Sequence, residues 1–241
     1  MSGLPLVLAA NAFDTFVQTL FKALALGSLY ALLALGFVLI YKATQTVNFA
    51  QGALALAGTW FLSIIFMDWN VPGRWIGGPG WVHWFIALVL AAVATGVLGL
   101  VIERLTIRPM IGEPVFSMAV ITLGLEVVVR VVAFDAVNTT PRVLGIPWGT
   151  ETFKIGGAMV AWSYVAAIGM AAAAFLGTWQ FFKTRTGVAM RATAFDQEAA
   201  LAQGISVGRI FAIAWAVGSA LAAISGIFAS MPPWGPAGMA S

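Results

Sequence analysis

Hydrophobic positions run through the chain in long segments that polar residues interrupt only briefly. Residues 155–182 and residues 210–241 contain no charged side chain. A helix needs about 20 apolar residues to cross a hydrocarbon core about 30 Å thick. Dividing the chain at its charges predicts a single all-α domain over residues 1–241, folded as a polytopic membrane helix bundle. Six transmembrane helices are predicted, over residues 23–41, 47–67, 82–102, 115–134, 157–182 and 210–229.

The fourth segment differs from the others because two charged residues lie inside it. Glu126 and Arg130 are four residues apart, so on a helix they share a face and can pair. A charge at membrane depth indicates a functional group by default. The alternative is a structural ion pair, with Arg130 near the outer end of the helix extending toward the interface.

Composition supports a membrane protein and excludes several chemistries. Hydrophobic residues make up 61% of the chain and charged residues 9%, whereas soluble domains carry about 25% charged residues. The absence of cysteine excludes disulfides, thiolate metal sites and cysteine nucleophiles. The net charge of +3 is spread along the chain, without the basic run typical of nucleic-acid binding. No phosphate-binding loop motif is present, so we expect ATP to bind a partner subunit and this chain to hold no cofactor. Because His83 is the only histidine, it cannot form a metal site with another, and we expect no metal.

The cations of the loops predict an orientation. Seven of them fall in the links after the first, third and fifth segments: Lys42, Arg104, Arg108, Lys183, Arg185, Arg191 and Arg209. Four fall in the N-terminal segment and the other two links: Lys22, Arg74, Arg142 and Lys154. Cytoplasmic loops carry the excess of Lys and Arg. We therefore expect the first group in the cytoplasm and the N-terminus outside.

Packing between the segments can also be predicted. The last segment repeats a small residue every fourth position at Gly218, Ala222 and Gly226, which favours close approach of a neighbouring helix. Because only a few residues separate the first two segments, we expect these to form a tight hairpin. Asn48 and Gln51 lie where the second segment begins, three residues apart on one face. They either point into the bundle, toward a wet path, or cap the helix at the cytoplasmic interface, where water satisfies them.

The link at residues 183–209 is polar, yet it has the pattern of a short helix. Asp196 is a good N-cap, Glu198 suits the first turn, and Gly204 suits the position after the last turn. Three apolar residues at helical spacing predict one apolar face: Phe195, Ala199 and Ala202. A helix of this kind between two membrane spans is either a docking element or an amphipathic helix lying on the lipid surface.

This link also carries a resemblance to a known family. The sequence Glu198-Ala-Ala, followed after three residues by Gly204, resembles the signature of bacterial ABC-importer permeases. Residues 27–41 and the sequence Asn48-Phe-Ala-Gln-Gly are similar to the opening of the branched-chain amino acid permease family. Glu103-Arg-x3-Arg-Pro and Gly187-x3-Arg-Ala resemble two further motifs of that family, in the same order.

The resemblance implies an inner-membrane permease subunit of a bacterial ABC importer for branched-chain amino acids or a related small solute. Its implied partners are ATP-binding subunits, a second identical or paralogous permease subunit, a periplasmic solute-binding protein and membrane lipid. The chain would then be no enzyme, since its partner binds the ATP. Because the family usually continues for about two more helices, we expect this chain to be truncated at its C-terminus.

Two sets of candidate residues follow. The resemblance assigns ATPase coupling to the link, at Arg191, Asp196, Glu198, Ala199, Ala200 and Gly204. The candidate translocation path consists of Asn48, Gln51, Glu126 and Arg130. The charged pair at Glu126 and Arg130 also permits an ion-coupled secondary transporter or channel that needs no ATPase. A third alternative, a membrane scaffold without transport activity, gains weight only if the chain is complete at Ser241.

Overall fold

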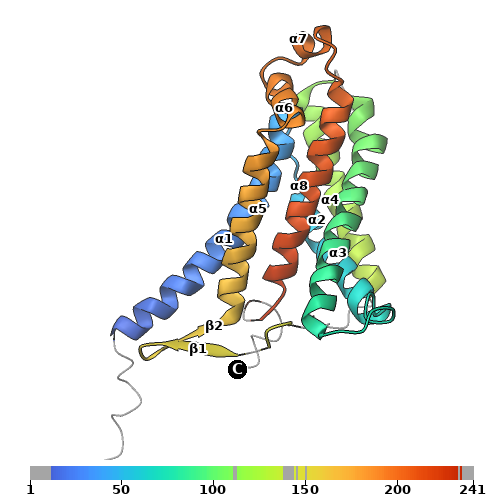
Figure 1. Cartoon of the computed structure of the whole chain (residues 1–241). Coiled ribbons are helices and arrows are strands. Elements are labelled where there is room, and N and C mark those ends of the chain that lie inside the picture. Colours follow the sequence, from blue (N-terminus) through green and yellow to red (C-terminus); the bar gives the residue numbers. More distant parts are fainter. Residues whose placement is uncertain are drawn as a thin grey trace, which may run out of the picture.

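The computed structural model describes residues 12–110, 113–137, 144, 146–149, 151–232 and 234. Its elements, in chain order, are α1 (Ala12–Thr44), α2 (Gln51–Ser63), η1 (Ile64–Asp68), α3 (Gly80–Ile102), η2 (Glu103–Ile107), η3 (Arg108–Met110), α4 (Val115–Val137), β1 (Thr152–Ile155), β2 (Ala158–Ala161), α5 (Trp162–Phe181), α6 (Arg185–Phe195), α7 (Gln197–Ala202) and α8 (Val207–Ala229). Six helical segments are long and apolar enough to cross a membrane. The predicted all-α bundle of six spans is confirmed (Figure 1).

Helix α8 lies at the centre of the bundle, between α1, α2 and α3 (Figure 1). Its small residues permit this close packing. A Cβ atom at Gly218 would lie 2.7 Å from Ile40 Cγ1 and 2.8 Å from the carbonyl oxygen of Gly36 on α1. A Cβ atom at Gly226 would collide with the backbone of Ala55 on α2. The close approach predicted for Gly218, Ala222 and Gly226 is confirmed, and Ala222 is fully buried.

The predicted tight hairpin of the first two spans is wrong. Helices α1 and α2 both pack along α8 and have little contact with each other. The small residues of α8 let this helix, the last of the described helices along the chain, fit between α1 and α2. Residues 45–50 then form an irregular link, and α2 begins at Gln51 rather than at residue 47.

Two predicted boundaries also need correction. Helix α1 begins at Ala12, not at residue 23, and includes Asp14 and Lys22. A negative charge in the first turn, such as Asp14, suits the helix dipole and does not end the helix. The fifth span begins at Trp162, because residues 152–161 form the antiparallel β1–β2 hairpin. Arg142, counted above with the outer loops, lies outside the described residues.

The hairpin is attached to α1. The backbone N–H of Gly157, in its turn, donates to Asp14 Oδ1 at 3.1 Å. Ala158 and Val160 of β2 are buried against Val17 of α1. The β-hairpin and helices α6 and α7 lie at opposite ends of the bundle (Figure 1). These ends are called here the hairpin end and the α6–α7 end.

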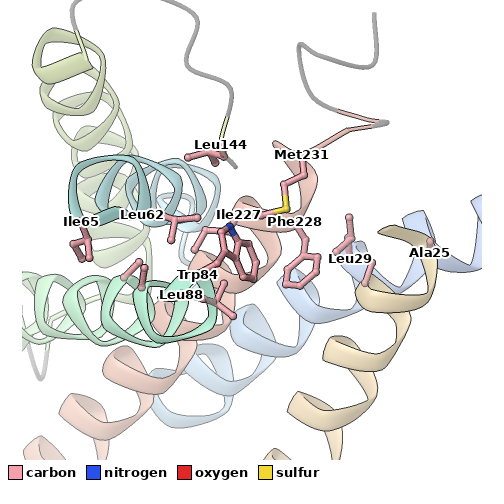
Figure 2. Close-up of a cluster of buried hydrophobic side chains, with 13 residues drawn as sticks. Ala25, Leu29, Leu62, Ile65, Trp84, Leu88, Leu144, Ile227, Phe228 and Met231 are labelled. Carbon is pink, nitrogen blue, oxygen red and sulfur yellow. The ribbon is translucent and has the colours of Figure 1, made fainter. Parts of the chain in front are cut away.

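A cluster of large apolar side chains fills the hairpin end of the bundle. Trp84 of α3 meets Phe228 of α8 and Trp148 edge to face, with ring centroids 6.0 and 5.6 Å away, and these two rings stack on each other. Leu62, Leu88 and Ile227 surround it (Figure 2). A second cluster, which includes Ile40, Ile107, Met190, Phe211 and Trp215, lies toward the α6–α7 end. Both clusters pack helices together.

Candidate functional site

The link between α5 and α8 folds into two short helices. Thr184 caps α6 by accepting a hydrogen bond from the N–H of Gly187 at 3.2 Å. The backbone then extends at Asp196, with φ −155° and ψ 113°. Asp196 Oδ1 accepts from the N–H groups of Glu198 and Ala199, at 2.9 and 3.0 Å. The predicted cap is confirmed, and Gly204 follows α7 with a φ of +79°, which suits glycine.

The predicted apolar face of this link is wrong. Because the extended backbone at Asp196 separates α6 from α7, helical spacing does not continue from Phe195 to Ala199. Phe195 ends α6 and is 95% exposed. On α7 the buried residue is Ala200, whereas Ala199 and Ala202 are exposed. The exposed large apolar side chains of the link are instead Val188 and Phe195 of α6 and Leu201 of α7.

Helices α6 and α7 lie at the outermost part of their end of the molecule (Figure 1), and α6 is attached to α1. Gln45 Nε2, just after α1, donates to the carbonyl oxygen of Ala194 at 3.2 Å. Lys42 Nζ lies 5.7 Å from the ring centroid of Phe182, which precedes α6. Met190 of α6 is fully buried. Arg191 is exposed. These contacts connect α6 directly to α1 and to the residue that follows it.

A salt bridge between Glu103 and Arg108 lies directly after α3, and Arg108 also bonds to the first turn of α8. Arg108 Nε and Nη2 donate to the two carboxylate oxygens of Glu103, at 3.0 and 3.3 Å. Arg108 Nη2 also donates to the carbonyl oxygen of Gly208 at 2.9 Å. Glu103 is 1% exposed. Both residues belong to a motif quoted above, yet neither was among the predicted site residues.

The local backbone explains how this pair forms and why the sequence did not predict it. Side chains five residues apart do not share a face of an α-helix. Residues Glu103–Ile107 are π-helical instead, and the N–H of Arg108 bonds to the carbonyl oxygen of Glu103. This i to i+5 pattern brings the two side chains to one side. A search restricted to pairs three or four residues apart cannot find it.

Asn48 and Gln51 lie inside the bundle. Their side chains are 2% and 5% exposed. Asn48 Nδ2 donates to Gln51 Oε1 at 3.1 Å, and Gln51 Nε2 donates to the carbonyl oxygen of Gly218 at 3.3 Å. Gly218 is the middle residue of α8, so this amide pair lies halfway along the central helix. The alternative, in which interfacial water satisfies both amides, is wrong; a role in a translocation path stays a prediction.

Helix α4 holds the link that precedes α2. Thr122 Oγ1 accepts from the N–H of Phe49 at 3.1 Å and lies 3.2 Å from the carbonyl oxygen of Val47, although its proton has a closer acceptor in the carbonyl oxygen of Ala119 at 2.7 Å. One turn further along α4, Arg130 Nη2 donates to Glu126 Oε1, which confirms that these two residues pair. Among the described residues, no hydrogen bond joins this pair to Asn48 or Gln51. The four predicted path residues thus form two separate pairs, one buried and one at the surface.

Comparison with known proteins places this arrangement in context. A family model described as "Branched-chain amino acid transport system / permease component" matches residues 19–233. The high-affinity branched-chain amino acid transport system permease protein LivH of Escherichia coli (strain K12) is 26% identical over 225 residues, which cover 90% of this chain and 71% of that protein. The corresponding protein BraD of Pseudomonas aeruginosa is 24% identical over 228 residues, with the same coverage. No solved structure gives a significant match.

Proposed function

The chain belongs to the family of branched-chain amino acid transport permeases, and from that membership we propose that it is the membrane subunit of an ATP-driven importer. The cargo is a branched-chain amino acid or a related small solute. One observation carries the ATP-driven part of this proposal. The link with Glu198-Ala-Ala and Gly204 forms two helices at the extremity of the molecule, and α6 is bonded to α1. A force applied there reaches the spans directly.

The proposal assigns each end of the molecule a side of the membrane. The α6–α7 end faces the cytoplasm of a bacterial inner membrane, because most of the loop cations lie on that side. Separate subunits bind and hydrolyse ATP and dock there. The N-terminus and the hairpin end face the periplasm, where a solute-binding protein delivers the cargo. Two permease subunits, identical or paralogous, complete the transporter.

The candidate path residues have the chemistry that an amino acid requires. Asn48 and Gln51 supply amide donors and acceptors halfway along α8, with the buried hydroxyl groups of Thr122 and Ser219 beside them in sequence or in space. Polar residues at such depth need partners, which a passing zwitterion supplies as well as the protein does. Glu126 and Arg130 supply one charge of each sign. Alternating access then requires two bundle arrangements of similar energy.

The coupling role is tested by uptake in vesicles that contain the complete transporter. Glu198→Lys and Gly204→Asp should each lower ATP-driven uptake by about 5- to 150-fold, the usual range of coupling free energies. Gly204→Asn is the matched control, because asparagine tolerates the left-handed backbone better than most residues. Membrane insertion should be unchanged in all three variants. Unchanged uptake in both test variants would count against a coupling role for α7.

A second candidate function is supported by one observation, the ion pair in the middle of α4. An ion-coupled secondary transporter would use Glu126 as a proton carrier, and Glu126→Gln would then abolish uptake driven by a proton gradient. Vesicles that contain this chain without any ATPase separate the two candidates. Uptake that follows the proton gradient and ignores ATP supports the second candidate and contradicts the first.

A further inference from the structure

We propose that Arg108 is a positioning residue for transport, which makes α3 follow the link of α6 and α7 when that link moves. It acts through the first turn of α8, where it binds the carbonyl oxygen of Gly208 while it holds the carboxylate of Glu103. The inference rests on the proposed function in one respect, that the link receives the work of a partner ATPase. Its evidence is the short connection from α7 to α8, the geometry of the guanidinium and the burial of Glu103.

The connection between α7 and α8 is short and bonded on both sides. Only residues 203–206 separate the two helices, and the N–H groups of the first three donate to carbonyl oxygens of α7 at 2.9–3.1 Å. The carbonyl oxygen of Ser206 accepts from the N–H of Arg209 in α8 at 3.0 Å. The chain thus passes from α7 straight into the top of α8 (Figure 1). A displacement of α7 therefore reaches Gly208, the second residue of α8.

The guanidinium of Arg108 has the geometry to carry this displacement to α3. It donates to both carboxylate oxygens of Glu103 at 3.0 and 3.3 Å, and to the carbonyl oxygen of Gly208 at 2.9 Å. A Cβ atom at Gly208 would lie 3.5 Å from Arg108 Cζ, so the guanidinium lies against the backbone of α8. Because a guanidinium presents its donors in a rigid fork, it fixes the distance between its two partners.

The burial of Glu103 makes this contact resist separation. The Glu103 side chain is 1% exposed. If Arg108 followed α8 away from Glu103, a buried carboxylate would lose its cation, which is strongly unfavourable. If Arg108 stayed with Glu103, the carbonyl oxygen of Gly208 would lose a charge-assisted hydrogen bond. Since either separation costs free energy, the end of α3 and the first turn of α8 move together.

A role limited to ending α3 does not explain the bond to Gly208. A cation near the C-terminus of a helix is favourable in itself, and the pair with Glu103 achieves this within one segment. The bond to Gly208 reaches across 100 residues of sequence. The pair also depends on the π-helical turn at Glu103–Ile107, and such turns are frequent at functional sites. Coupling between two helices accounts for the bond to Gly208, and helix termination does not.

The rest of the interface between α3 and α8 lets the movement continue along α3. A Cβ atom at Gly96 would lie 3.1 Å from the carbonyl oxygen of Ala216, and one at Gly99 would collide with Ser219 Oγ. Helices in such close contact have little room to slide past each other. Helix α3 also carries Trp84, in the apolar cluster of the hairpin end. A movement that begins at the salt bridge is thus passed toward the opposite end of the molecule.

The amount of cargo transported per ATP measures this coupling. Glu103→Gln combined with Arg108→Met removes the salt bridge and the bond to Gly208 without leaving a buried charge. Uptake of radiolabelled leucine and hydrolysis of ATP are measured together in vesicles that contain the complete transporter. We expect the double variant to lower the leucine transported per ATP by about 2- to 30-fold, the range for residues that modulate coupling. A merely structural role lowers uptake and hydrolysis together and leaves their ratio unchanged.

Two control variants lie in the same turn. Glu103→Gln alone keeps an acceptor oxygen for Arg108 and keeps the bond to Gly208, so the ratio should stay near that of the native protein. Thr106→Val removes a hydrogen bond to the carbonyl oxygen of Ile102, which joins no second helix, and should leave the ratio unchanged. Arg108→Lys is a second test variant that keeps the carboxylate paired. It loses the fork, so the ratio should fall by at least about twofold.

Two results would overturn the inference alone. An unchanged ratio in the double variant or in Arg108→Lys would show that the salt bridge only stabilises the subunit. An equal loss in Thr106→Val would show that any change in this turn uncouples transport. In both cases the native protein still takes up leucine with ATP, so the importer function stands. Absence of ATP-driven leucine uptake by the native protein would instead contradict the proposed function, and this inference with it.

Discussion

Helices α4 and α8 have equal lengths of 23 residues and the same mean hydropathy over their most apolar windows. Yet 61% of that window is buried in α8 and 17% in α4. Helix α8 carries Gly218 and Gly226 at close contacts with α1 and α2, whereas the middle of α4 is rich in valine. Small residues permit close approach of a neighbouring helix. They do not by themselves place a helix at the centre, since the alanine-rich α5 is only 11% buried over its most apolar window.

The two ion pairs sharpen this comparison and give the largest expected effect. Arg108 joins Glu103 to the first turn of α8, whereas Arg130 bonds within α4. Arg108→Met leaves the buried carboxylate of Glu103 without its cation, which costs about 3–5 kcal/mol. Arg130→Met in the isolated subunit should cost less, because its pair lies within α4 and joins no second helix among the described residues. Titration of both purified variants with a denaturing detergent measures the two free energies of unfolding.

A double variant provides the control for this prediction. Glu103→Gln combined with Arg108→Met removes both charges, so it should be more stable than Arg108→Met alone. Equal losses in the single variants at residues 108 and 130 would show that the bond to Gly208 does not hold α8.

Adding methyl groups to one glycine of each helix should give an intermediate effect. Gly226→Val forces branched carbon atoms into the backbone of Ala55 and should cost about 1–3 kcal/mol. Gly124→Val on α4 is the matched control, because no atom lies within 4 Å of the Cβ position there. Thermal unfolding in detergent, followed by tryptophan fluorescence, compares the two. If Gly124→Val proves as harmful, small residues do not account for the central place of α8.

A single interhelical hydrogen bond should give the smallest effect. Ser225 Oγ on α8 donates to the carbonyl oxygen of Leu29 on α1 at 2.8 Å. Ser225→Ala should cost about 0.6 kcal/mol, the average for such bonds within membranes. Ser28→Ala removes a bond within α1, from Ser28 Oγ to the carbonyl oxygen of Ala25, and should cost less. The same fluorescence measurement applies, and a larger loss at residue 28 would contradict the interhelical role of Ser225.

Much of the fold could be predicted from the sequence because membrane insertion depends on composition over long windows. All six spans were found, as was the small-residue stripe of α8. The extension of α1 to Ala12 was missed, because an exposed charge near a helix end is tolerated. The β-hairpin at residues 152–161 was also missed, since its apolar residues fit a helix equally well.

The candidate site could be predicted only where the signal is local. The cap at Asp196 and the turn at Gly204 depend on a few neighbouring residues, and both are confirmed. The partners of Gln51 and Arg108 on α8 lie 167 and 100 residues away in sequence. No pattern within one segment indicates such contacts. They depend on α8 fitting between helices that precede it by 100 residues or more.

Helix α1 is bonded at both of its ends. Asp14 accepts from the turn of the β-hairpin, and Gln45, directly after Thr44, donates to α6. Helix α1 itself runs unbroken for 33 residues, about 50 Å in length. Such a rod acts as a mechanical strut across the bilayer. While α1 keeps its internal hydrogen bonds, an axial push on α6 arrives at the hairpin on the opposite side as a movement of similar size.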